Sequence, residues 1–185
     1  MADTPAANTV SQEEVVAAMQ AATIEVFSTM LSLEVTPAPT LTEHTISTSN
    51  TSGVMSIVGI AGVWSGTGGL SCSGTLACKL SSQFLMTECD VVNDDVLDAI
   101  GEITNMIIGN VKTMLEDRLG PMGLSTPSVI FGRNFQTRSS RSNEWTVLPF
   151  ESGEERIYVQ MCIGPSANTS RTVRPGFQIP AVLNV

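Results

Sequence analysis

The chain has 185 residues, of which 42% are hydrophobic and 15% are charged, a composition typical of one compact domain. Nine Lys and Arg stand against eighteen Asp and Glu, and no basic residue precedes Lys79, so we expect neither nucleic acid nor an anionic membrane surface as a partner. No basic, hydrophobic leader and no bilayer-length apolar run occur, so we expect a cytoplasmic protein.

The cysteines show no pattern that binds a metal. No two of the four cysteines form a C-x-x-C pair, and the only histidine is His44. The cysteines are Cys72, Cys78, Cys89 and Cys162. Zinc sites need four ligands at recognisable spacings, and redox motifs need paired thiols. We therefore expect buried thiols in a reducing compartment, and no cofactor or metal bound by this chain.

The first predicted element is a helix. Residues 1–10 are small and polar, and we expect them to be disordered. Ser11 and Glu14 form a capping box, and apolar residues then recur at three- and four-residue spacing until Pro37. This pattern predicts a helix over residues 11–31.

Strands and a short helix are predicted next. Residues rich in β-favouring side chains predict strands at 40–48, 54–61 and 66–73. Within the last of these, the glycine-rich stretch 66–69 lacks the Gly-Lys-Ser/Thr ending of a phosphate-binding loop, so we assign it a turn role. Helical spacing of apolar residues returns up to Met86, and we interpret this methionine as core filler.

The longest periodic segment predicts a helix from Asn93 to Gly120. Asn93 is a good N-cap, and Asp94 and Asp95 complement the positive end of the helix dipole. One face is a continuous apolar stripe that must pack on a sheet or another helix. The stripe consists of Val96, Ile100, Ile103, Ile107, Val111, Met114 and Leu115.

The remaining residues predict the end of one domain. We expect a short apolar run at 128–131 and a polar loop at 133–143. A hairpin at 145–163 and a C-terminal tail at 164–185 follow. The folded domain is therefore expected to cover residues 11–163.

A polar ridge lies opposite the apolar stripe of the long helix. Its members recur at spacings of four and three residues and are Asp98, Glu102, Asn105, Gly109, Lys112 and Glu116. Glu102 and Asn105 are neighbours on this ridge. Gly109 costs about 1 kcal/mol relative to alanine in a helix interior, which suggests a close approach by another group. By pattern alone, such a ridge is more typical of a solvated surface.

The sequence DAIGEITNMIIGNVK at residues 98–112 resembles the signature helix of the CheC, CheX and FliY chemotaxis phosphatases, most closely CheX. That pattern has an acidic residue or Ser, three residues, Glu, two residues, Asn and a downstream Pro. Asp98, Glu102 and Asn105 match it, and Pro127 lies one residue short of the usual gap. The resemblance extends over residues 11–163 and includes the stretch STPSVIFG around Pro127.

The resemblance implies an α/β fold of the α+β type, with long helices packed on an antiparallel sheet and an internal pseudo-two-fold repeat, as in CheC-like proteins. It also implies a homodimer. In the repeat, Glu25 and Ser28 lie under Glu102 and Asn105. The first helix thus keeps the glutamate but lacks the amide, so we expect one working site, as in CheX-like proteins.

The resemblance implies hydrolysis of the aspartyl phosphate of a phosphorylated CheY-like receiver domain. Asn105 would hold the attacking water and Glu102 would pair with the receiver lysine, while the receiver supplies Mg²⁺. Asp98, Gly109, Lys112 and Pro127 are the further binding residues that we expect. Two alternatives remain: a non-catalytic module that docks on a receiver or a flagellar-switch component, and a structural scaffold.

Overall fold

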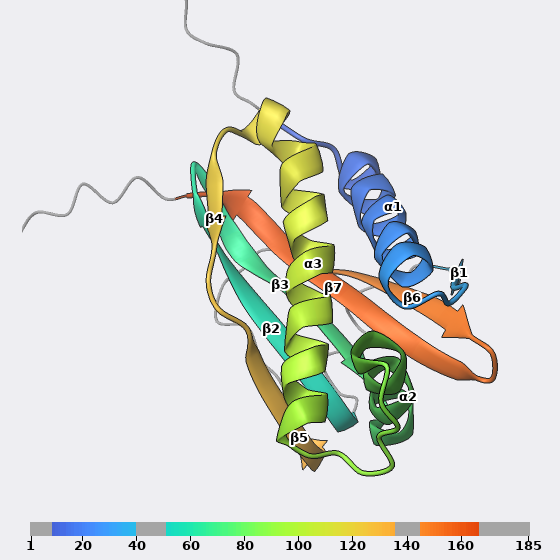
Figure 1. The fold of residues 1–185 in the computed structure, drawn as a ribbon. Helices are drawn as coiled ribbons and strands as arrows, with labels where there is room; N and C mark the ends of the chain where they lie inside the picture. The colour runs from blue at the N-terminus through green and yellow to red at the C-terminus, as the bar shows by residue number, and fades with distance from the viewer. Residues whose placement is uncertain (1–8, 40–50, 136–144, 167–185) are drawn as a thin grey trace, which may run out of the picture.

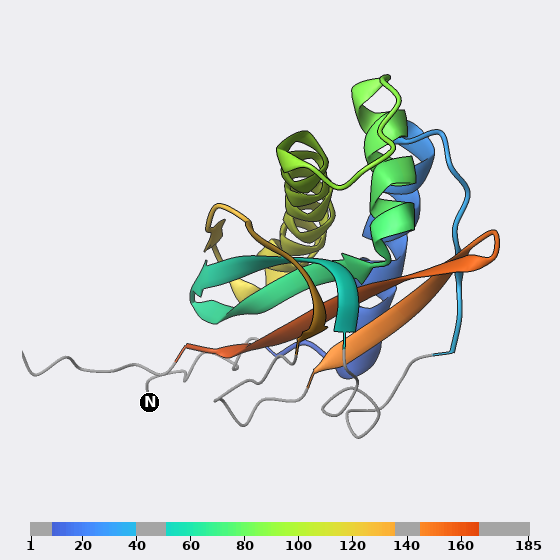
Figure 2. The ribbon, with the colours of Figure 1, turned by 90° about the horizontal axis from the view of Figure 1, so that it is seen from below.

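The computed structural model describes residues 9–39, 51–135 and 145–166, and the strand predicted at 40–48 lies outside them. In the described part, three helices cover one face of a seven-stranded antiparallel sheet (Figures 1 and 2). The predicted α+β fold is confirmed. The helices are α1 (Gln12–Met30), α2 (Gly74–Leu85) and α3 (Asp94–Leu119). The strands are β1 (Thr36–Pro37), β2 (Thr51–Gly62), β3 (Trp64–Cys72), β4 (Met122–Leu124), β5 (Ser128–Phe135), β6 (Thr146–Ser152) and β7 (Glu155–Pro165).

The capping box of α1 is confirmed. Ser11 Oγ accepts a hydrogen bond from Glu14 N at 3.2 Å, and Glu14 Oε2 accepts one from Ser11 N at 2.9 Å. These two bonds satisfy donors that the first turn of a helix leaves free. The buried face of the helix includes Met19, Ala22 and Phe27, which pack into the common core. None of the described helices is long and apolar enough to cross a bilayer.

Helix α3 begins where its sequence predicts. Asn93 Oδ1 accepts a hydrogen bond from Val96 N at 3.0 Å, and the helix ends before Gly120, whose φ of 84° is in the region that favours glycine. The apolar stripe is buried against the sheet and the other helices except at Met114, where the prediction was wrong. Met114 lies at the border of the stripe, beside Thr113, and 43% of its surface is exposed.

The sheet shows the predicted repeat in its connectivity. Its order is β1-β6-β7-β3-β2-β4, and β5 also pairs with β2. Two hairpins, β2–β3 and β6–β7, meet along the central β3–β7 pair. Helix α1 and strand β1 precede the first hairpin. Helix α3 and strands β4 and β5 precede the second. Each set of short strands pairs with the hairpin of the other repeat.

The glycine-rich stretch is not a turn, so this prediction was wrong. Residues 66–69 lie inside β3 and pair with β2 and β7 on either side. A Cβ atom on Gly68 would lie only 2.6 Å from Ile108 Cδ1 of α3. Glycine is required here because α3 packs very closely on the sheet. The glycines therefore help to set the position of the helix that carries the polar ridge.

Two other boundaries differ from the prediction. Residues 133–135 belong to β5, since this strand pairs with β2 as far as Phe135 opposite Thr51, and the rest of the expected loop lies outside the described residues. At the other end, β7 continues through Gly164 to Pro165, which pair with Ser65 and Trp64. The strand therefore ends two residues after the expected domain boundary. A proline at a strand end removes no central ladder bond.

Candidate functional site

The outer ridge of α3 brings Glu102 and Asn105 together. Asp98 and Glu102 are exposed and Asn105 is half-buried, whereas Ile100, Ile103 and their neighbours on the opposite face are buried. Residues three apart lie on adjacent turns of a helix surface. The pair therefore lies side by side on the surface of α3 that faces away from the sheet.

These side chains are not engaged by the rest of the described chain. Among the residues that the structure describes, none forms a hydrogen bond or ion pair with the side chain of Asp98, Glu102 or Asn105. A carboxylate offers charged oxygen acceptors, and an amide on the same ridge offers a neutral oxygen acceptor and two N–H donors. The ridge is therefore free to bind polar groups of a partner.

The C-terminal part of the ridge is used inside the chain. Lys112 Nζ lies 2.8 Å from Glu116 Oε1, which also accepts a hydrogen bond from Met122 N at 2.9 Å. The bond from Lys112, followed by that from Met122 N, lowers the pKa of the Glu116 carboxyl. Lys112 thus helps to hold the start of β4 against the end of α3, and it is not a free cation on the ridge.

Gly109 has no internal packing reason to be glycine. A Cβ atom at this position would meet only Leu124 Cδ1, at 3.8 Å, which is an ordinary van der Waals distance. Its carbonyl oxygen accepts a hydrogen bond from Thr113 Oγ1 of the same helix at 2.9 Å. The position remains open on the outer surface, where a partner could approach.

Pro127 packs on α3 beside the site. A Cβ atom on Gly101 would lie 3.5 Å from Pro127 Cβ and 3.4 Å from Val129 Cγ2. Gly101 immediately precedes Glu102, so the structure brings Pro127 next to the signature residues. Gly101 was not among the site residues predicted from the sequence. The available signal was a second glycine in the helix interior, eight residues before Gly109.

The corresponding groups on α1 are used locally. Ser28 Oγ donates a hydrogen bond to the carbonyl oxygen of Glu25 at 3.0 Å, within its own helix. The Glu25 carboxylate accepts one from Asn110 Nδ2 of α3 at 3.5 Å. This long contact joins two helices that already pack together. The pair on α1 therefore differs from the pair on α3, whose side chains have no such internal partners in the described chain.

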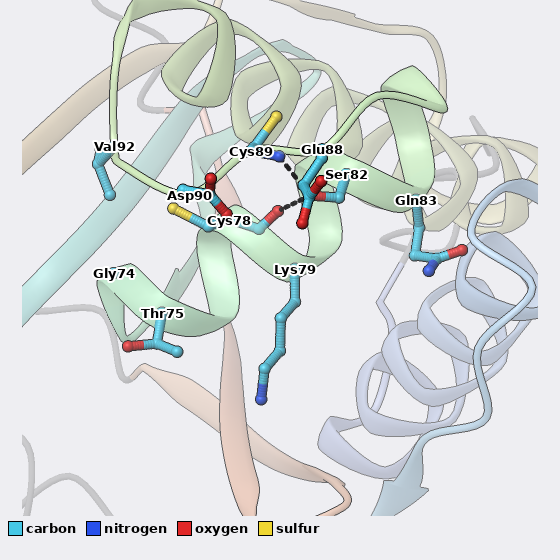
Figure 3. Close-up of a pocket in the computed structure, with 10 residues that line it drawn as sticks. All are labelled: Gly74, Thr75, Cys78, Lys79, Ser82, Gln83, Glu88, Cys89, Asp90 and Val92. Carbon is cyan, nitrogen blue, oxygen red and sulfur yellow. Dashed lines mark hydrogen bonds between the residues drawn. The ribbon is translucent and has the colours of Figure 1, made fainter.

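A surface groove lies beside α2 and the loop that follows it (Figure 3). Cys78, Ser82, Cys89 and Asp90 line it together with neighbouring residues, and Ser82 Oγ accepts a hydrogen bond from Cys89 N at 2.9 Å. Burial, followed by the nearby Cys89 and Asp90, raises the pKa of the Cys78 thiol. A raised pKa favours the protonated thiol, which is the less nucleophilic form.

The remaining cysteines are free thiols that are buried or partly buried. All four are free thiols, and burial raises the pKa of Cys72 to about 12. Cys162 is also buried, whereas Cys89 is partly exposed. Within residues 9–39, 51–135 and 145–166, no group of three or more His, Cys, Asp and Glu side chains is placed to hold a metal ion.

Comparisons with known proteins point to one family. The family model described as Chemotaxis phosphatase CheX matches residues 54–151, whereas comparison with curated proteins gives no significant match. The fold is similar to that of chemotaxis protein CheX from Vibrio vulnificus, with 25% identity, a TM-score of 0.72 and coverage of 82% of this chain and 99% of that chain. It is also similar to that of a putative chemotaxis protein from Desulfovibrio vulgaris Hildenborough, with 27% identity, a TM-score of 0.69 and coverage of 84% of this chain and 100% of that chain. A chain of the CheX–CheY–BeF3–Mg²⁺ complex from Borrelia burgdorferi has 24% identity to this chain and a TM-score of 0.66, with coverage of 80% of this chain and 97% of that chain.

Proposed function

Since this chain belongs to the CheX family of chemotaxis phosphatases, we propose that it hydrolyses the aspartyl phosphate of a CheY-like receiver domain. The observation that carries the proposal is the outer ridge of α3, where Glu102 and Asn105 match the family spacing and have no partners among the described residues. The similar Borrelia burgdorferi structure is a complex of CheX with CheY, which supports a receiver domain as the partner.

Asn105 is the proposed catalytic residue. Hydrolysis requires a water molecule in line with the bond between phosphorus and the aspartyl oxygen, and catalysis of phosphoryl transfer is mainly positioning and charge stabilisation. A carboxamide can accept a hydrogen bond from this water, and its N–H groups can donate to a phosphoryl oxygen. It remains uncharged beside the phosphate, so it is not repelled. Water attack then releases inorganic phosphate and restores the receiver aspartate.

Glu102 is the proposed docking residue. A carboxylate facing a phosphoryl group would be repelled, so its suitable target is a cation, and the lysine of the receiver active site provides one. Such a charge-assisted contact becomes stronger when the complex excludes water. Because Glu102 and Asn105 are adjacent on one rigid helix, this contact would also orient the amide. Asp98 and Gly109 extend the docking surface on the same ridge.

The cation needed for charge stabilisation is proposed to come with the substrate. The receiver's own Mg²⁺ would lie beside the phosphoryl oxygens and neutralise charge as the bond breaks. The residues of this chain would then need only to place the water and hold the receiver. We also propose that the chain works as a cytoplasmic homodimer, whose mass analytical ultracentrifugation would measure.

A dephosphorylation assay tests the catalytic proposal. Purified chain is added to a phosphorylated receiver with Mg²⁺, and release of inorganic phosphate is followed. Asn105→Ala should lower the rate by at least about 100-fold, because it removes the group that positions the water. Asn110→Ala is the matched control, since it removes an amide from the same helix away from the Glu102–Asn105 pair. Equal rates for wild type and Asn105→Ala would contradict the assignment.

A binding measurement separates docking from chemistry. Calorimetry with a stably activated receiver should show that Glu102→Gln weakens the complex by about 10-fold or more, whereas Asn105→Ala changes affinity much less. Glu88→Gln is the control for loss of an exposed charge elsewhere on the surface. Wild-type binding without faster dephosphorylation would replace the proposed phosphatase by a non-catalytic receiver-binding module.

A further inference from the structure

We propose that Ser125 is a positioning residue for Asn105, and that it acts by anchoring the segment between β4 and β5 beside the amide. The inference rests on the proposed phosphatase function and adds a residue outside the signature helix. Ser125 itself would touch neither the water nor the phosphoryl group. Its role would be to restrict the orientations that the Asn105 side chain adopts.

Contacts on either side of Asn105 place this segment. Leu124 is next to Gly109, one turn after Asn105, at 3.8 Å from where a Cβ atom would be. Pro127 is next to Gly101, one turn before Asn105, at 3.5 Å from the corresponding point. The two glycines are eight residues apart, which is about 12 Å along a helix axis. Residues 124–127 extend over about 10 Å, so they span most of the distance between the two glycines, and Asn105 lies midway between these in sequence. Figure 1 shows the segment between β4 and β5 beside α3.

The burial of the ridge agrees with this arrangement. Glu102 is exposed, whereas Asn105 is half-buried, on the side of the ridge nearer to Gly101. Pro127 lies within van der Waals distance of a Cβ position at Gly101, and Leu124 lies within that distance at Gly109. Residues 124–127 can therefore form a wall along one side of the amide. The opposite side of Asn105 remains open toward Glu102.

Hydrogen bonds of Ser125 fix this wall to the sheet. Ser125 N donates to the carbonyl oxygen of Gly59 at 2.9 Å, and Gly59 N donates to Ser125 Oγ, also at 2.9 Å. Ser125 Oγ in turn donates to the carbonyl oxygen of Thr126 at 2.9 Å. Strand β2 pairs with β4 from Ile60 onward and with β5 up to Ile57. The serine therefore bridges the break between these two ladders.

The Asn105 amide needs such support from packing. Its side chain has no hydrogen-bond partner among the described residues, so no internal bond selects one of its rotamers. A water molecule can be placed in line only while the amide keeps one orientation. Loss of the Ser125 hydroxyl would leave Gly59 N without its acceptor, and only the backbone bond from Ser125 N to the Gly59 carbonyl oxygen would then hold the segment at its midpoint. The wall beside the amide would become less rigid.

Steady-state kinetics of Ser125→Ala test this role. We expect kcat to fall by about 10-fold with KM within about twofold of wild type, because the amide is misplaced while the docking ridge is intact. Ser125→Thr retains the hydroxyl and should restore most of kcat. Ser82→Ala is the matched control, since Ser82 Oγ likewise accepts from a backbone N–H, that of Cys89, at 2.9 Å and donates to a carbonyl, that of Cys78, at 2.8 Å. Its kcat should equal that of wild type.

Two further measurements keep the outcome unambiguous. Thermal unfolding of each variant shows that the assays are run on folded protein. NMR relaxation of the Asn105 side-chain ¹⁵N should show greater mobility in Ser125→Ala than in wild type. An unchanged kcat in an active enzyme, or an amide as rigid as in wild type, overturns the positioning role. If wild type does not dephosphorylate receivers, the proposed function fails, and the relaxation measurement alone decides the role of Ser125.

Discussion

Ser56 places a buried hydroxyl in the core without a described partner. It is fully buried in β2, and its Oγ makes no hydrogen bond with any residue that the structure describes. Removing an unsatisfied buried hydroxyl removes a desolvation penalty, so Ser56→Ala should raise the free energy of unfolding by up to about 1 kcal/mol. Ser81→Ala is the control, because Ser81 Oγ donates to the carbonyl oxygen of Val96. Ser81→Ala should lower the free energy of unfolding, which urea titrations measure for both variants. A loss of stability in Ser56→Ala would contradict the prediction.

Met86 combines an unfavourable backbone with full exposure. It caps α2 with a φ of 53°, and 92% of its surface is exposed, so the interpretation as core filler was wrong. Glycine adopts this left-handed conformation without steric cost, and Met86→Gly should raise stability by about 0.5–1 kcal/mol. Leu85→Gly is the matched control, since the preceding residue is helical and should lose about 1 kcal/mol. Thermal unfolding compares the two; a lower Tm for Met86→Gly would show that its side chain contributes to stability.

The signature residues could be found from sequence because their spacing is local. Glu102 and Asn105 are three residues apart on a strongly periodic helix, so pattern alone puts them on one ridge. Their roles came from the family resemblance. The contacts of Leu124 with Gly109 and of Pro127 with Gly101 could not be found in this way, because they form only through folding of the β4–β5 segment. Non-local contacts of this kind have no signature in one sequence.

At the scale of elements, Glu155 links the first turn of α2 to β7. Its carboxylate accepts hydrogen bonds from the hydroxyl of Ser73, the N-cap of α2, and from Lys79 Nζ at 3.0 Å. The bond from Ser73, then those with Lys79, lower the pKa of this carboxyl below its ordinary value of 4.5. A lowered pKa in the folded state means that the link stabilises the fold above about pH 4.5 and is lost as pH falls through the folded-state pKa.

Glu155→Gln should therefore be less stable than wild type at neutral pH. The difference in free energy of unfolding should shrink as the pH is lowered from 4.5, because the wild-type carboxyl then becomes protonated. Glu154→Gln is the control, since the neighbouring residue is exposed and should show no such pH-dependent difference. Denaturant titrations at several pH values measure both variants. A difference that is constant with pH would contradict a contribution from the charge of Glu155.

Elements with their own local signals were predicted well. Capping side chains and apolar periodicity located α1 and α3, and a turn at Gly153 joins the predicted hairpin β6–β7. Strands β1 and β4 have only two and three residues, and their pairing depends on β6 and β2, which are distant in sequence. The glycines of β3 were misread because glycine usually marks turns. Here Gly68 instead lets Ile108 pack directly on the sheet.

At the scale of the whole molecule, the repeat predicts a single receiver site. Only α3 carries the glutamate–asparagine pair, whereas Glu25 and Ser28 of α1 contact groups of their own chain. Calorimetric titration with an activated receiver should give one receiver per chain. Glu25→Ala should leave this stoichiometry and the affinity unchanged, in contrast to Glu102→Gln. Two receivers per chain, or a loss of binding in Glu25→Ala, would show that the ridge on α1 is also used.

The exchange of short strands between the two repeats has a consequence for how the molecule can be divided. β1 borders the hairpin that follows α3, and β4 and β5 border the hairpin that follows α1. A fragment that stops after β3 would lack the border of its own hairpin and would leave the edge of β3 unpaired, open to aggregation. Each unit depends on strands of the other for the border of its hairpin. The smallest piece that can fold cooperatively therefore contains both.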